Sequence, residues 1–192
     1  MIYRIEKDKN IELAAQIIIN GDIIIYSTDT LYGFGVDATN SKAIEKLNKI
    51  KGRSQPYSIV VSSLNMLKKY AKINNDIEIR LKKIFPGPFT AILKKIDNNL
   101  SELVTTNLPT VGVRIPNFNP ILKVIKKIKK PIITTSVNYH GESSINKLQL
   151  IESFYPDIDI FTDYKDKESI GSTIIDFSSN PFKILRQGDG VY

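Results

Sequence analysis

The sequence has 192 residues and a formal net charge of +7, and 42% of it is hydrophobic, which is enough for a buried core. It has no cysteine, which excludes disulfides and thiolate metal sites. Its one histidine, His140, argues against a histidine metal site and a Ser-His-Asp triad. Because no segment approaches the roughly 20 apolar residues of a membrane span and the N-terminus lacks a signal-peptide pattern, we expect a cytoplasmic protein.

Strands and helices alternate along most of the predicted chain. In chain order the expected elements are a strand (1–5), a helix (10–22), a strand (22–27), a helix (41–52), a strand (57–62), two helices (63–71 and 76–85), two strands (89–96 and 110–116), a helix (119–130), a strand (131–138), a helix (146–154) and three strands (158–163, 172–177 and 182–188). This order predicts an α/β fold with a partly antiparallel sheet. Because no linker or repeat interrupts it, we expect one domain over residues 1–192.

Capping residues mark the ends of the first two predicted helices. Asn10 is the expected N-cap of the first helix, and Gly21 lies just past its end. Asn40 or Ser41 is the expected cap of the second, and Gly52 is its stop signal.

Polar strings that contain glycine or proline recur where predicted strands end. They are STDTLYGFG, KGRS, PGPFT, TVGVRIP, TTSVNYHGESS, GSTIID and RQGDG. In open α/β sheets, ligands bind at strand ends, so these strings together predict a binding site. The two common glycine-rich phosphate-binding motifs, GxxxxGK[ST] and GxGxxG, are absent from the sequence, and no carboxylate pair or nucleophile stands out.

Arginine is scarce in a lysine-rich background. The positive charge either attracts polyanions such as nucleotides and RNA or reflects that background alone. The five arginines are Arg4, Arg53, Arg80, Arg114 and Arg186, and the polar strings contain three of them, Arg53, Arg114 and Arg186. A planar, bidentate donor suits carboxylate and phosphate groups, whereas chance and surface ion pairs are the alternative explanation.

Two further positions join these arginines as candidates. Lys51 and Arg53 stand at a predicted helix end, where they either cap carbonyl groups or clamp phosphates. Ser136 and Asn138 point to one side of a strand and offer a hydroxyl and an amide to a ligand, or else form a turn.

Taken in order, these strings resemble the YrdC-like family of threonylcarbamoyl-AMP synthases. The family pattern runs TDTxYGxG, KxR, PGPxT, VGVRxP, SxN, STxxD and RxG. In this sequence the motifs lie at residues 28–35, 51–53, 86–90, 111–116, 136–138, 172–176 and 186–188. Each motif alone is weak, but all seven in order are specific.

The resemblance implies a twisted open sheet, mixed parallel and antiparallel, with flanking helices and a basic concave groove. It implies a single-domain enzyme that makes threonylcarbamoyl-AMP and pyrophosphate from L-threonine, bicarbonate and ATP with Mg²⁺. The product would serve the threonylcarbamoyl modification of adenosine in tRNA, completed by a downstream transferase. Direct contact with tRNA is a further possibility under this resemblance.

The resemblance also implies roles for individual residues. Lys51, Arg53, Ser136 and Asn138 would form the catalytic centre. L-Threonine would be bound by Thr30, Arg114, Ser136 and Ser172, and ATP by Lys51, Arg53, Thr110, Asn138, Asn146 and Arg186. No protein nucleophile is needed, because positioning and charge stabilisation would supply catalysis.

The sequence departs from the family pattern after Arg53. The loop there is about two residues shorter, and the strand containing Ser58–Val61 lacks a histidine that binds threonine in some members. His140 is expected to be a loop residue and not a replacement. Two alternatives remain: a related domain that makes a different carbamoyl-adenylate, and a non-catalytic protein that binds double-stranded RNA or tRNA. The role of Asp29 is left open between orienting its loop and lying near a metal.

Overall fold

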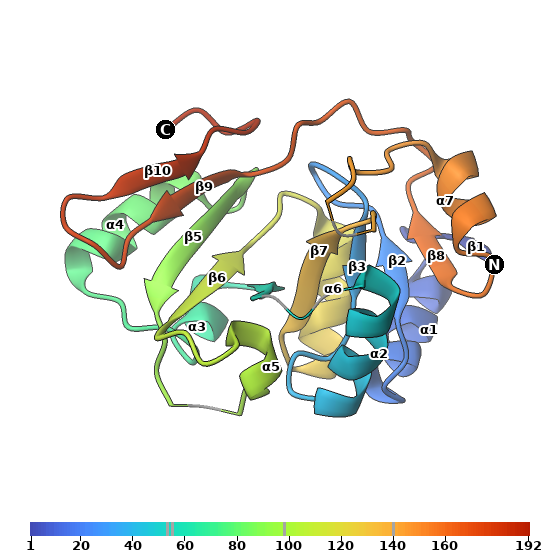
Figure 1. The fold of residues 1–192 in the computed structure, drawn as a ribbon, viewed down its shortest axis with the longest axis horizontal. Coiled ribbons are helices and arrows are strands. Elements are labelled where there is room, and N and C mark those ends of the chain that lie inside the picture. Colours follow the sequence, from blue (N-terminus) through green and yellow to red (C-terminus); the bar gives the residue numbers. More distant parts are fainter. Residues whose placement is uncertain (53, 55, 98, 140) are drawn as a thin grey trace.

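The computed structural model describes residues 1–52, 54, 56–97, 99–139 and 141–192 (Figure 1). Its strands are β1 (Ile2–Arg4), β2 (Ile24–Tyr26), β3 (Gly33–Gly35), β4 (Ser58–Val60), β5 (Phe89–Lys94), β6 (Thr110–Arg114), β7 (Ile132–Ser136), β8 (Asp159–Thr162), β9 (Thr173–Asp176) and β10 (Lys183–Arg186). Its helices are α1 (Asp8–Ile19), α2 (Ser41–Lys51), α3 (Leu64–Leu67), α4 (Asn75–Ile84), α5 (Glu102–Thr105), α6 (Asn119–Ile128) and α7 (Leu148–Phe154).

The described strands form one mixed sheet in the order β1-β8-β2-β3-β7-β4-β6-β5-β9-β10. Four neighbouring pairs are parallel, namely β1/β8, β8/β2, β4/β6 and β5/β9. The other five pairs, β2/β3, β3/β7, β7/β4, β6/β5 and β9/β10, are antiparallel. The mixed sheet with flanking helices confirms the predicted fold class.

Helices cover both faces of this sheet, because successive strand residues point to opposite sides. Ile24, Val60 and Ile132 pack in one core with the apolar sides of α1 and α6. Their chain neighbours Ile25 and Ile59 pack in the other core with residues of α2. Figure 1 shows the same arrangement, with α1 and α6 behind the sheet and α2 in front of it. No helix in the described ranges is both long enough and apolar enough to cross a membrane.

Capping predictions succeed at α2 and fail in part at α1. The Asn40 side chain accepts a hydrogen bond from the Ala43 backbone N–H at the start of α2, and Gly52 ends the helix in the left-handed conformation. Gly21 lies just past the end of α1, as predicted. Asn10 is not an N-cap, however, because α1 begins at Asp8. The Asn10 side chain instead donates to the Arg4 carbonyl and ties α1 to the end of β1.

Two short elements were not predicted. Strand β3 lies inside the polar string STDTLYGFG, where glycine argued for a turn. Its glycines admit the Tyr26 ring, since a Cβ atom on Gly35 would lie 2.8 Å from a ring carbon. Helix α5 forms in a segment too short to show helical periodicity, and the Ser101 hydroxyl caps it by accepting from the Leu103 N–H.

We predict that Asn40→Ala lowers the free energy of unfolding by about 1 kcal/mol, because the Ala43 N–H loses its acceptor. Urea denaturation followed by circular dichroism measures the change. Lys7→Ala is the matched control, since Lys7 holds the same position before α1 without a side-chain capping bond. Equal destabilisation by both substitutions would show that the Asn40 side chain contributes no capping energy.

Candidate active site

A cavity of about 250 Å³ opens on one face of the sheet. It lies over the central strands, and the loop after β2 and the segment before β9 also contribute to its walls. Hydroxyl groups and two guanidinium groups dominate its lining, which includes Thr28, Ser58, Thr90, Arg114, Ser136 and Arg186. The lining therefore favours an anionic ligand that accepts many hydrogen bonds.

Small residues keep the space above the sheet open. Ser58 pairs in register with Gly112 on β6 and with Thr134 on β7, so two small side chains and a glycine lie side by side across three strands. A Cβ atom on Gly112 would lie 2.5 Å from the Ser58 hydroxyl oxygen. A larger side chain at Gly112 would therefore displace Ser58, which lines the cavity.

The loop after β2 is held by its own hydroxyl groups. The Thr28 hydroxyl accepts from the Thr30 backbone N–H at 3.0 Å and donates to the Leu31 carbonyl at 2.7 Å. Thr30 is buried, and its hydroxyl oxygen accepts from Arg114 at 3.0 Å. Two threonines in a tight turn thus fix a rigid support behind the Arg114 guanidinium.

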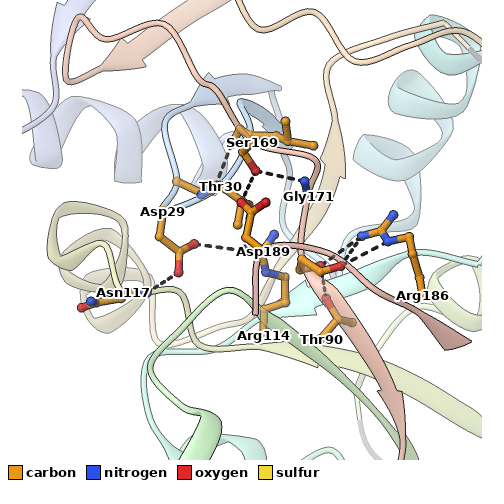
Figure 2. Close-up of polar contacts among 12 residues, drawn as sticks. Asp29, Thr30, Thr90, Arg114, Asn117, Ser169, Gly171, Arg186 and Asp189 are labelled. Atoms are coloured by element: carbon orange, nitrogen blue, oxygen red, sulfur yellow. Dashed lines mark hydrogen bonds and ion pairs between the residues drawn. The ribbon is translucent and has the colours of Figure 1, made fainter. Parts of the chain in front are cut away.

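Arg114 is a buried cation whose described hydrogen bonds use only one of its three nitrogens. It is only 8% exposed, and its Nη2 donates to Asp29 Oδ1 and to Thr30 Oγ1, each at 3.0 Å (Figure 2). Its Nε atom is buried, and no described residue accepts its hydrogen. Buried N–H groups are rarely left unpaired, so Arg114, a residue of the cavity lining, has donor capacity left for a ligand oxygen.

Arg186 provides a second cation at the same cavity. Its Nε and Nη2 donate to the Ser172 carbonyl at 3.1 and 2.7 Å, and the Ser172 hydroxyl lies 2.8 Å from that of Thr90. Although much of Arg186 is exposed, partial burial of its guanidinium and then the charge of Arg114 lower its pKa. Repulsion between these two cations would be relieved by an anion bound between them.

The segment between β8 and β9 closes one side of the cavity. Ile170 lines it, and Asp189 holds this segment by accepting from the Ser169 hydroxyl and from the Ile170 backbone N–H (Figure 2). The C-terminal residues can pack this closely because position 188 is glycine. A Cβ atom on Gly188 would lie 2.2 Å from the Gly171 carbonyl oxygen.

Lys51 is buried at the end of α2 and organises the loop after β7. Its ammonium group donates to the Ser136 carbonyl at 2.9 Å, to the Asn138 carbonyl at 2.7 Å and to the Asn138 side-chain oxygen. The Ser136 hydroxyl also donates to the Asn138 side-chain oxygen at 2.8 Å. Lys51 therefore fixes the backbone from which Ser136 lines the cavity.

Comparison with known proteins identifies the family. Residues 16–188 match the family model for Sua5, YciO and YrdC proteins, which carries the description "Telomere recombination". The chain belongs to the Sua5/YciO/YrdC family. Its membership confirms the resemblance that the seven motifs predicted.

Several relatives in this family have names or bound ligands. The chain is 35% identical to the putative threonylcarbamoyl-AMP synthase of Methanocaldococcus jannaschii, across 95% of this chain and 87% of that protein. It is 33% identical to the threonylcarbamoyl-AMP synthase of Pyrococcus abyssi, but spans only 55% of its length. The structure of Pyrococcus abyssi Sua5 with L-threonine has a TM-score of 0.87 at 31% identity, covering 98% of this chain and 56% of that one. Escherichia coli YciO, at 22% identity, shows the shared fold alone.

The structure places most of the expected family residues at or beside one cavity. Arg114, Ser136, Ser172 and Arg186 line it, and Thr30 contacts Arg114 directly. Lys51 and Asn138 lie behind Ser136, as described above.

The remaining expected site residues, Thr110, Asn146 and Arg53, either do not line the cavity or lie outside the described residues. Thr110 begins β6, at the end of the strand away from Arg114, and Asn146 has a buried side-chain oxygen without a partner among the described residues. Neither is part of the cavity lining within those residues, whereas Ser144 is. Arg53 and His140 lie outside the described residues.

Sequence reasoning missed several members of this Sua5/YciO/YrdC site. Thr134 could have been found, because it lies two residues before Ser136 on the same side of β7. Thr28 and Thr90 stood inside quoted motifs but received no role. Asp29 was left open between a loop and a metal role, and it proves to be the ion-pair partner of Arg114.

We predict that Lys51→Met lowers the free energy of unfolding by about 2 to 4 kcal/mol, because buried acceptors after β7 lose their donor. Thermal and urea denaturation measure the effect. Lys49→Met, two residues earlier and with an exposed side chain, is the control. A destabilisation no larger than that of the control would contradict the organising role of Lys51.

Proposed function

We propose that this chain makes threonylcarbamoyl-AMP and pyrophosphate from L-threonine, bicarbonate and ATP. The observation that carries the proposal is the buried Arg114 guanidinium, which belongs to the lining of a hydroxyl-rich cavity and whose bonds to described residues use only Nη2. Such a donor suits the carboxylate of a free amino acid. The names of the relatives and the threonine complex of one of them support the same reaction.

The threonine end of the site would occupy the cavity itself. Its volume of about 250 Å³ is near the lower end of ligand pockets, which run from about 300 to 1,000 Å³. An amino acid suits that volume better than an amino acid together with a whole nucleotide. We propose that Arg114 takes the carboxylate and that hydroxyls of Thr30, Ser136 and Ser172 bind the remaining polar atoms.

The nucleotide would then lie toward the rim of the cavity. We propose that Arg186 attracts the α-phosphate region and that Arg53 and the charge of Lys51 act on the phosphates that leave. Asn138, Thr110 and Asn146 are the further candidates for contacts to the nucleotide. The contacts of Lys51 give it a second contribution, since it holds Ser136 and Asn138 in place whether or not ATP is bound.

The reaction then needs two bond-forming steps. The threonine amine attacks the carbon of CO₂ or bicarbonate and forms a carbamate. A carbamate oxygen attacks the α-phosphorus of ATP, and the bond to pyrophosphate breaks; from bicarbonate, one water is also released. The carbamate and the transition state at the α-phosphorus are both anionic, so the cations at the cavity would stabilise the charge that develops.

Magnesium would enter with ATP in this proposal. Among the described residues, no group of three His, Asp or Glu side chains could hold a metal ion. Asp29 already accepts hydrogen bonds at both carboxylate oxygens. Because Mg²⁺ is commonly bound largely through nucleotide phosphates and water, we assign it no protein ligand and derive no step from it.

Three broader predictions accompany the reaction. We propose that the product is passed to a transferase that modifies tRNA, that the chain acts in the cytoplasm, and that residues 1–192 are one domain. A protein that only binds RNA would use stacking aromatics and an exposed basic face. Both Arg114 and Arg186 instead face a small cavity, which favours the enzyme.

The central experiment measures pyrophosphate release from the purified chain. We expect release only when ATP, L-threonine and bicarbonate are all present, together with a product whose mass matches threonylcarbamoyl-AMP. No release above the blank at any threonine concentration would contradict the proposal. Release with another amino acid in place of threonine would keep the adenylate chemistry but reject the substrate.

Substitution of Arg114 by lysine tests whether Arg114 binds the threonine carboxylate. Lysine keeps a positive charge beside Asp29, so the aspartate is not left next to a neutral residue. We predict that Arg114→Lys raises the KM for threonine at least about tenfold, because lysine keeps the charge but loses the planar donor set. The KM for ATP should stay within about threefold. Arg80→Lys, in an exposed ion pair with Asp76, is the control. Equal rises in both KM values would remove the carboxylate role from Arg114.

A further inference from the structure

We infer that Asp29 is a positioning residue that orients the Arg114 guanidinium for the substrate carboxylate. This inference rests on the proposed function. Asp29 Oδ1 accepts from Arg114 Nη2 at 3.0 Å, and Oδ2 accepts from the Asn117 backbone N–H at 2.8 Å. Figure 2 shows Asp29 between these two partners.

The contacts of Asp29 suit orientation of a neighbour better than contact with a ligand. The Asp29 and Arg114 side chains are each only 10% exposed, so their interaction is poorly screened by water. With one oxygen on Arg114 and the other on Asn117, the carboxylate cannot turn without breaking a bond. The pair therefore joins the loop after β2 to the turn that follows β6.

The contact with Asp29 decides which nitrogens of the Arg114 guanidinium are already hydrogen-bonded before a ligand binds. Asp29 and Thr30 together occupy Nη2, and Nε is the buried donor without an acceptor among the described residues. The guanidinium is thus held through Nη2, while Nε and Nη1 have no acceptor among the described residues. If Asp29 did not fix Nη2, the guanidinium would be free to turn and the Nε donor would lose its direction.

Charge points to the same role. Arg114 and Arg186 act on one cavity, and the positive charge of Arg114 lowers the pKa of Arg186. Asp29 neutralises Arg114. The negative charge of Asp189 raises the pKa of Arg186, whereas burial and the positive charge of Arg114 lower it. The two aspartates thus offset the mutual repulsion of the arginines. The Arg114 end of the cavity, where Asp29 offsets the cation, therefore suits a singly charged carboxylate.

The test is Asp29→Asn, because an amide has one acceptor oxygen and keeps at most one of the two bonds. We expect the KM for threonine to rise about tenfold or more, with the KM for ATP and the kcat at saturating threonine nearly unchanged. Asp29→Glu, which keeps the charge but moves it by one methylene, should also raise the KM for threonine. It serves as the test if Asp29→Asn does not fold.

Asp37→Asn is the matched control. Asp37 is also buried, with one oxygen on a lysine, Lys130, and the other on a backbone N–H, that of Thr39, but Lys130, unlike Arg114, is not among the described residues that line the cavity. We expect a similar loss of thermal stability from both substitutions, with a change in the KM for threonine only at Asp29.

Two outcomes would overturn the inference while the proposed function stands. In the first, the wild type releases pyrophosphate in a threonine-dependent way, but the Asp29 variants change the KM for threonine no more than Asp37→Asn does. The other is a change in the Mg²⁺ requirement of the Asp29 variants with an unchanged KM for threonine, which would make Asp29 a metal ligand. A wild type that releases no pyrophosphate would overturn the proposed function, and this inference with it.

Discussion

The buried ion pair between Arg114 and Asp29 is the interaction on which the arrangement of the site depends. A buried guanidinium is costly unless it is paired and hydrogen-bonded, and removal of one partner leaves the other charge uncompensated. Here the pair, together with the Asn117 N–H, joins the loop after β2 to the end of β6 and the turn that follows it. The guanidinium is therefore fixed through Nη2, and its Nε and Nη1 donors have no acceptor among the described residues.

The sheet provides the setting for this pair through its register. Strands β4, β6 and β7 align Ser58, Gly112 and Thr134, and these small residues leave room that larger ones would fill. The same alternation places apolar side chains of the neighbouring rows in the two cores. Along each strand, residues that pack in the cores are thus next to residues that line the cavity. A shift of one residue in register would turn each set to the opposite face of the sheet.

Local signals in the sequence predicted what depends on local physics. The cap at Asn40, the stop at Gly52 and the apolar strands follow from short patterns, and the structure has them. The predicted cap at Asn10 was wrong because α1 begins earlier, at Asp8, and the Asn10 side chain bonds to the Arg4 carbonyl instead. The motifs predicted a site and its arginines, but the pairing of Asp29 with Arg114 spans 85 residues. No spacing rule reveals such a contact, so the role of Asp29 required the fold.

Lys51 illustrates why a motif residue can serve the fold and the reaction together. A lysine reserved for phosphates would be expected at the surface, whereas this ammonium is buried against carbonyls of the loop after β7. Its charge nevertheless remains in the protein interior beside the residues that line the cavity, where the field of a cation is screened less than at the surface. The lysine thus links the end of α2 to Ser136 and Asn138. An anion bound at these residues would interact with a positive charge that folding has already fixed in position.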